Sequence, residues 1–180
     1  MEERASNGKS GPVVIGYDGS DEAAKAIAFV AGLLPGSEAL VVTAWKSISE
    51  AILAVALGPA PPISDPGDAD ARQRRAAESL SREGAKRASQ AGLRAESVAV
   101  RADGPIWAAI AKVADQRGAR LVAVGAQGRA GVETVMPGSV AVGLVHHSSR
   151  PVLVVTSPQP AKEKKRAEQV VGRAQSSPRR

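Results

Sequence analysis

Short, uninterrupted runs of aliphatic residues recur along the chain, separated by segments with helical character. The runs begin near residues 13, 40, 97, 121 and 152, and most of them do not alternate with polar residues. Strands of this kind are buried on both faces, which is typical of a parallel sheet between two layers of helices. We therefore predict an α/β protein with a doubly wound sheet of five parallel strands.

The segments between these runs carry helix signals. Ile27, Val30, Ala31 and Leu34 recur at the spacing of one helical face, and Pro35–Gly36 ends that helix. Residues 46–68 contain Ala, Gly and Pro without a clear pattern, apart from one short helical stretch near Glu50–Leu57. Further helices are predicted over 69–91, from Pro105 in a first turn to Gly118, and over 139–147.

Charge is distributed unevenly along the 180 residues. The net charge is +6, and residues 162–180 carry seven basic and two acidic groups, which leaves the rest nearly neutral. We expect a flexible N-terminal arm over 1–11, one domain over 12–156 and a disordered basic tail over 157–180.

Composition excludes several classes of protein. The chain has no cysteine and only four aromatic side chains, which argues against a thiolate site and against a stacking platform for nucleic acid. No apolar run approaches the ~20 residues of a membrane span, and the polar N-terminus does not resemble a secretory signal. We expect a cytoplasmic protein with no membrane and no nucleic-acid partner.

Two predicted strand ends carry the residues that suggest chemistry. A turn beginning at Asp18 follows the first strand. The pattern Gly125-x2-Gly128-x9-Gly138-Ser139, called the glycine motif below, follows the fourth and opens a helix. If the strand order is 3-2-1-4-5, both ends meet where the order reverses, which is where such sheets bind ligands.

These residue types suit a nucleotide. Glycine lets the backbone approach a ligand closely, and a helix N-terminus attracts phosphate. Ser139 is predicted to cap its helix and to offer a hydroxyl, Arg129 to add charge, and Asp18 to accept hydrogen bonds from an adenine amino group or a ribose hydroxyl. The P-loop pattern and the G-x-G-x-x-G fingerprint are both absent from the sequence.

The glycine motif matches the nucleotide-binding signature of the universal stress protein family. The opening strand and turn, Val13–Ser20, and the closing strand, Pro151–Val155, also resemble that family, so that the resemblance spans roughly 12–156. It implies a Rossmann-like fold and a homodimer. It also implies binding of ATP, with Mg²⁺ or Mn²⁺ held mainly by phosphate and water oxygens.

The resemblance also implies roles for individual residues. Asp18 would meet the adenine, and a residue around Val42–Ala44 would line the base pocket. Gly125 and Gly138 would approach the ribose, and the phosphates would meet Gly128, Arg129, Ser139 and Val140. Gln127 stands where the family often has His or Arg, and Pro137 where it often has Leu. Both departures bear on affinity rather than on the fold.

Alternatives remain at this stage. Gly125 and Gly128 also fit ordinary turns, and Asp18 also fits a turn residue that bonds its own backbone. The leading function is a regulatory module that binds adenine nucleotides without significant catalysis. The alternatives are a slow ATPase, or a dimeric interaction protein that has lost nucleotide binding. The last strand, Val152–Val155, is predicted to be an edge strand that pairs with a second copy.

Overall fold

The five predicted strands form one parallel sheet. The computed structural model describes residues 11–47, 66–127 and 138–156. Within these residues the sheet has the order β3-β2-β1-β4-β5, as predicted, with β1 and β4 adjacent at the reversal. The strands are β1 (Val13–Gly16), β2 (Glu38–Trp45), β3 (Arg94–Arg101), β4 (Leu121–Gly125) and β5 (Val152–Val155).

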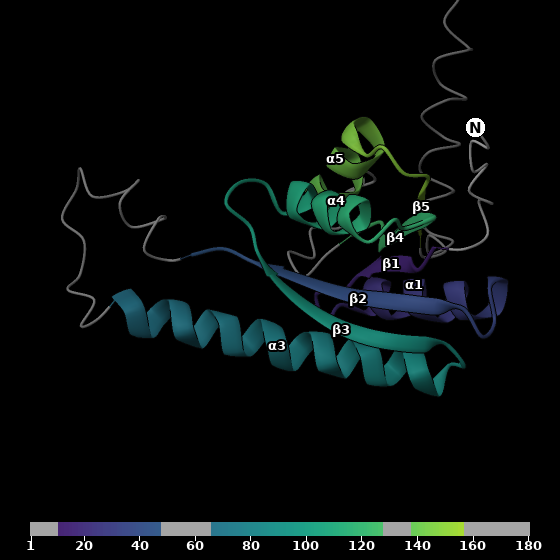
Figure 1. Cartoon of the computed structure of the whole chain (residues 1–180), viewed down its shortest axis with the longest axis horizontal. Coiled ribbons are helices and arrows are strands. Elements are labelled where there is room, and N and C mark those ends of the chain that lie inside the picture. The colour runs from purple at the N-terminus through teal and green to yellow at the C-terminus, as the bar shows by residue number, and fades with distance from the viewer. Residues whose placement is uncertain (1–10, 48–65, 128–137, 157–180) are drawn as a thin grey trace, which may run out of the picture.

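Helices cover both faces of this sheet (Figure 1). The helices are α1 (Asp21–Leu33), α3 (Pro66–Gln90), α4 (Ile106–Gln116) and α5 (Ser139–His147). Helices α1 and α3 pack on one face, and α4 and α5 pack on the other. No helix in the described part of the chain is long and apolar enough to cross a membrane.

Each face has its own aliphatic core. Ile15 and Val41 pack with α1 and α3, while Val14 and Val42 pack with α4 and α5. Successive strand residues point to opposite faces, so a continuous apolar run fills both cores. Leu144 of α5 is completely buried in the second core.

Helices α4 and α5 approach closely at a glycine. A Cβ atom on Gly143 would lie 2.1 Å from Cδ1 of Trp107, so the indole ring lies directly against the α5 backbone. The same ring stacks on His147, with ring centroids 4.6 Å apart. Trp107 therefore joins the two helices that cover this face of the sheet.

Several boundaries differ from the sequence predictions. Helix α3 begins at Pro66, three residues before the predicted start, and β3 runs from Arg94 to Arg101 rather than over 97–100. Because β3 is an edge strand, polar residues such as Glu96 interrupt its apolar run. Pro105 is the N-cap of α4 rather than a first-turn residue. The stretch near Glu50–Leu57 lies outside the described residues.

Candidate functional site

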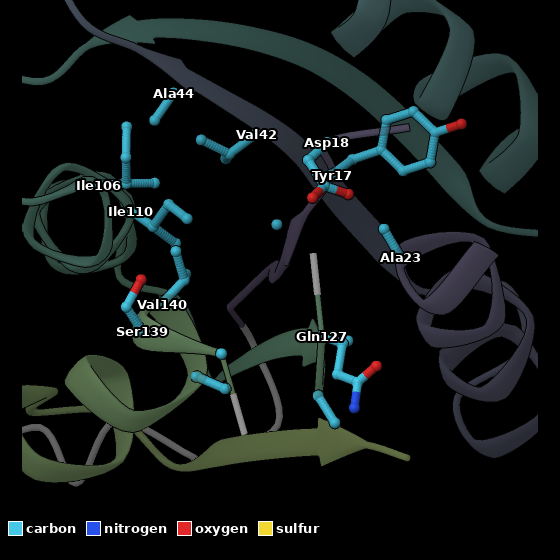
Figure 2. A pocket seen from close by; sticks show the side chains of 15 residues that line it. Tyr17, Asp18, Ala23, Val42, Ala44, Ile106, Ile110, Gln127, Ser139 and Val140 are labelled. Carbon is cyan, nitrogen blue, oxygen red and sulfur yellow. The ribbon is translucent and has the colours of Figure 1, made fainter. Parts of the chain in front are cut away.

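A cleft of about 270 Å³ lies at the carboxyl ends of β1 and β4, where the strand order reverses. Parallel sheets bind ligands at this position because helices and loops diverge there. Side chains from α1, β2, α4 and α5 complete the walls (Figure 2). The lining residues are Gly16, Tyr17, Asp18, Ala23, Val42, Ala44, Ile106, Ile110, Gly125, Ala126, Gln127, Gly138, Ser139, Val140 and Ala141.

Asp18 is held in place by the start of α1. Its Oδ1 accepts hydrogen bonds from the Ser20 backbone N–H (3.0 Å) and from the Ser20 hydroxyl (2.6 Å). The Ser20 oxygen in turn accepts the Ala23 N–H at 3.2 Å and caps α1, as its residue type suggests. Gly19 between them has φ of 82°, which glycine adopts without strain. The turn interaction considered from the sequence is thus present, and it fixes a carboxylate at the cleft.

Tyr17, immediately before Asp18, is buried and points away from the apolar wall, toward α3 (Figure 2). Its phenol donates a hydrogen bond to Glu83 Oε1 at 3.1 Å. Burial raises the pKa of the phenol, and the bond to the Glu83 carboxylate raises it further. Tyr17 therefore remains a neutral hydrogen-bond donor at physiological pH.

One wall of the cleft is apolar. Val42 and Ala44 project from β2, Ile106 and Ile110 from α4, and Val140 from α5 (Figure 2). An aliphatic surface of this kind accepts a flat ring, because it excludes water from the face of the ring that packs against it. The wall is suited to a heterocyclic base.

The start of α5 forms another part of the cleft, beside Val140 of the apolar wall (Figure 2). Gly138 is the N-cap, and its N–H donates to the Ala126 carbonyl at 2.6 Å. Ser139 was predicted to be the cap, and this was wrong: it is the first helical residue, and no side chain caps α5. The first N–H groups of a helix lack intrahelical acceptors, and they favour an anion. The Ser139 hydroxyl is still available at the cleft.

Six of the eight predicted site residues lie together at this cleft. They are Asp18, Val42, Gly125, Gly138, Ser139 and Val140. The other two, Gly128 and Arg129, lie outside the described residues, as does Pro137. Gln127, one of the two departures from the family pattern, also lines the cleft.

Gly125 has a second reason to be glycine. A Cβ atom there would lie 2.7 Å from the Glu22 Cβ and 2.8 Å from the Glu22 carbonyl carbon. Close packing of α1 against β4 thus requires a glycine whether or not a ligand approaches.

Sequence reasoning missed the contribution of α4. Ile106 and Ile110 share one face of the predicted helix, but their periodicity does not reveal which part of that face reaches the cleft. The only available signal was topological, since α4 precedes β4, which borders the cleft.

The universal stress protein family model matches residues 10–156. The match covers well over half of the chain, and the chain therefore belongs to the universal stress protein family. A comparison with curated protein sequences found no match.

Solved structures share the fold. A hypothetical protein whose biochemical function was assigned from its structure superposes with a TM-score of 0.65 and 18% identity, over 83% of this chain and 97% of that one. The universal stress protein from Archaeoglobus fulgidus in complex with dAMP superposes with a TM-score of 0.53 and 20% identity, over 80% of this chain and 96% of that one. A universal stress protein in complex with cAMP superposes with a TM-score of 0.52 and 25% identity, over 81% of this chain and 96% of that one.

Proposed function

We propose that this protein is a stress-response regulatory module of the cytoplasm that binds ATP or a related adenine nucleotide. One observation carries the proposal: the Asp18 carboxylate, an apolar wall and the N-terminus of α5 border the same cleft at the sheet reversal. A nucleotide needs a slot for its base, an acceptor for its polar groups and donors for its phosphates. Complexes of family members with dAMP and cAMP support the same class of ligand.

In the proposed complex the base lies against Val42 and Ile110, while Asp18 accepts from an adenine or ribose donor. The phosphates extend toward Ser139 and the first N–H groups of α5. The part of the glycine motif outside the described residues, Gly128 with Arg129, is proposed to complete the phosphate site.

A divalent cation is proposed to accompany ATP. Among the described residues no group of three or more His, Asp or Glu side chains is placed to hold a metal ion. We therefore assign Mg²⁺ or Mn²⁺ to the phosphate and water oxygens, which these hard cations prefer.

We propose binding without significant hydrolysis. Asp18 is the one carboxylate among the described residues that line the cleft, and Ser20 orients it through two hydrogen bonds to its Oδ1. A general base must contact the attacking water, whereas we assign Asp18 to the base or ribose of the nucleotide. The role given to Asp18 is recognition.

Calorimetric titration of the full chain with ATP, combined with a phosphate-release assay, tests this proposal. We expect saturable binding, and phosphate release no faster than in buffer. Asp18→Ala is expected to weaken ATP binding more than binding of inorganic triphosphate. Asp21→Ala removes the same charge from an exposed position outside the cleft and is the matched control. Absence of ATP binding by the folded chain contradicts the proposal, and rapid phosphate release favours the ATPase instead.

We also propose that the protein forms a homodimer through β5. In the described sheet β5 pairs with β4 and is an edge strand. The carbonyls of Pro151 and Val155 accept hydrogen bonds from the β4 side. Because backbone groups alternate along a strand, those of Val154 point toward the open edge. A second copy of β5, antiparallel about a two-fold axis, would satisfy them.

A further inference from the structure

Beyond the end of β1, the chain is held at three points on Tyr17. The Tyr17 N–H donates to the Val42 carbonyl at 2.9 Å, and the Thr43 hydroxyl donates to the Tyr17 carbonyl at 2.8 Å. The phenol is bound to Glu83 of α3. The backbone of Tyr17 is thus tied to β2, and its side chain to α3, before the chain reaches Asp18.

The Thr43 hydroxyl holds a specific peptide group. The Tyr17 carbonyl belongs to the planar peptide bond that ends at the Cα atom of Asp18. Restraining that oxygen therefore restrains the position of the Asp18 Cα atom, from which the side chain leaves the backbone. On its other side, the Asp18 carboxylate is tied to Ser20, so the carboxylate is fixed from both directions.

Thr43 itself does not line the cleft. Val42 and Ala44, its neighbours on β2, do line it, and Thr43 points to the opposite face of the sheet. Only 6% of Thr43 is exposed, in a strand that is otherwise aliphatic over residues 39–44. A buried hydroxyl is costly unless it is hydrogen-bonded, and valine would fill the same space. The hydrogen bond to the Tyr17 carbonyl explains why this position is threonine rather than valine.

The Tyr17 ring is also confined by α3. A Cβ atom on Gly84 would lie 2.7 Å from the Tyr17 Cδ1 atom and from the Val41 Cγ1 atom. Helix α3 thus approaches the ring because residue 84 is glycine. Because the ring is packed against α3, it restricts movement of the Tyr17 backbone.

We propose that Thr43 is a positioning residue that orients the Asp18 carboxylate for base recognition from the far side of β2. This inference rests on the proposed nucleotide-binding function. Preorganisation of a recognition group increases affinity because no ordering is required on binding. Loss of the Thr43 hydroxyl should therefore affect the part of the affinity that depends on the base and ribose, and it should spare the phosphates.

The test compares Thr43→Val, which removes the hydroxyl at constant shape, with Thr43→Ser, which retains it. ATP and inorganic triphosphate are titrated into each folded variant. We expect Thr43→Val to bind ATP about fivefold to tenfold more weakly, and to change triphosphate binding by less than about twofold. Thr43→Ser should restore the wild-type ratio. Equal losses for the two ligands, or no loss for ATP, would overturn the proposal.

Hydrogen exchange of the ligand-free protein provides an independent readout. Amide exchange at residues 18–20 is expected to be faster in Thr43→Val than in the wild type, and unchanged in Thr43→Ser. If the wild type does not bind ATP, the proposed function fails, whereas this comparison still decides the positioning role. Should Thr43→Val not fold, Thr43→Ala removes the same hydroxyl and should accelerate the same amides. Unchanged exchange in the variant measured contradicts the proposal.

Discussion

Gly125→Ala should destabilise the protein even in the absence of any nucleotide. The new methyl group would lie 2.7 Å from the Glu22 Cβ and 3.0 Å from the Ala23 backbone nitrogen. Contacts this short with a backbone cannot be relieved by a side-chain rotation, so α1 must move away from β4. Forced overpacking of a core costs about 1–3 kcal/mol, whereas the lower chain entropy of alanine returns about 0.4–1 kcal/mol.

The expected net loss is about 0.5–2 kcal/mol, equivalent to a fall in Tm of about 1–8 °C for a chain of this size. Thermal unfolding followed by circular dichroism, without nucleotide, measures it. Gly32→Ala is the matched control, because a Cβ atom there meets nothing within 4 Å on an exposed part of α1. That change should raise Tm, since alanine is the better helix former. A Gly125→Ala protein as stable as the wild type would show that this glycine serves ligand approach alone.

Three further predictions concern the edge strand, the termini and pH. Val154→Pro should shift the proposed dimer toward monomer, because it removes a backbone N–H that points to the open edge. Light scattering after size-exclusion chromatography measures the shift. A folded variant that stays dimeric argues against the interface. Removal of residues 157–180 should change Tm by no more than about 1–2 °C in a melting experiment, and a larger fall would mean that this segment packs on the domain. Hydrogen bonds from Ser149 and Arg150 lower the pKa of Asp115. The ionised Asp115 should therefore stabilise the fold fully above the ordinary carboxyl pKa of 3.8, and this stabilisation should disappear as the pH falls through the lower pKa of the folded state. In a denaturation experiment, the stabilities of the wild type and Asp115→Asn should converge in acid.

The fold could be predicted because the sequences of the interior strands are almost entirely apolar. β1, with all four residues buried, and β4 read as uninterrupted apolar runs, which only a parallel sheet covered on both faces can bury. The edge strand β3 was shortened in the prediction because Glu96 interrupts its pattern. The start of α3 was misplaced because Pro66 resembles a breaker, although proline is compatible with a first turn.

The position of the candidate site was predictable to the extent that single residues have special backbone roles. Asp18 and Gly138 stand at a strand end and a helix start, and topology brings such positions together at one edge of the sheet. Ile106 and Thr43 could not be found in this way, because an aliphatic helix residue and a threonine in a strand look like ordinary core. The capping residue of α5 was wrong by one position, since Ser139 is a stronger cap by residue type than the glycine that precedes it.

An NMR titration of the isotope-labelled chain with ATP and Mg²⁺ tests the central claim most directly. If the nucleotide occupies the cleft between β1 and β4, the largest amide shift changes should occur at Asp18, Val42, Gly125 and the first turn of α5. Val98 of β3 lies outside the cleft lining and should be nearly unaffected. Shift changes concentrated away from the cleft, or none at millimolar ATP, would contradict the proposed site.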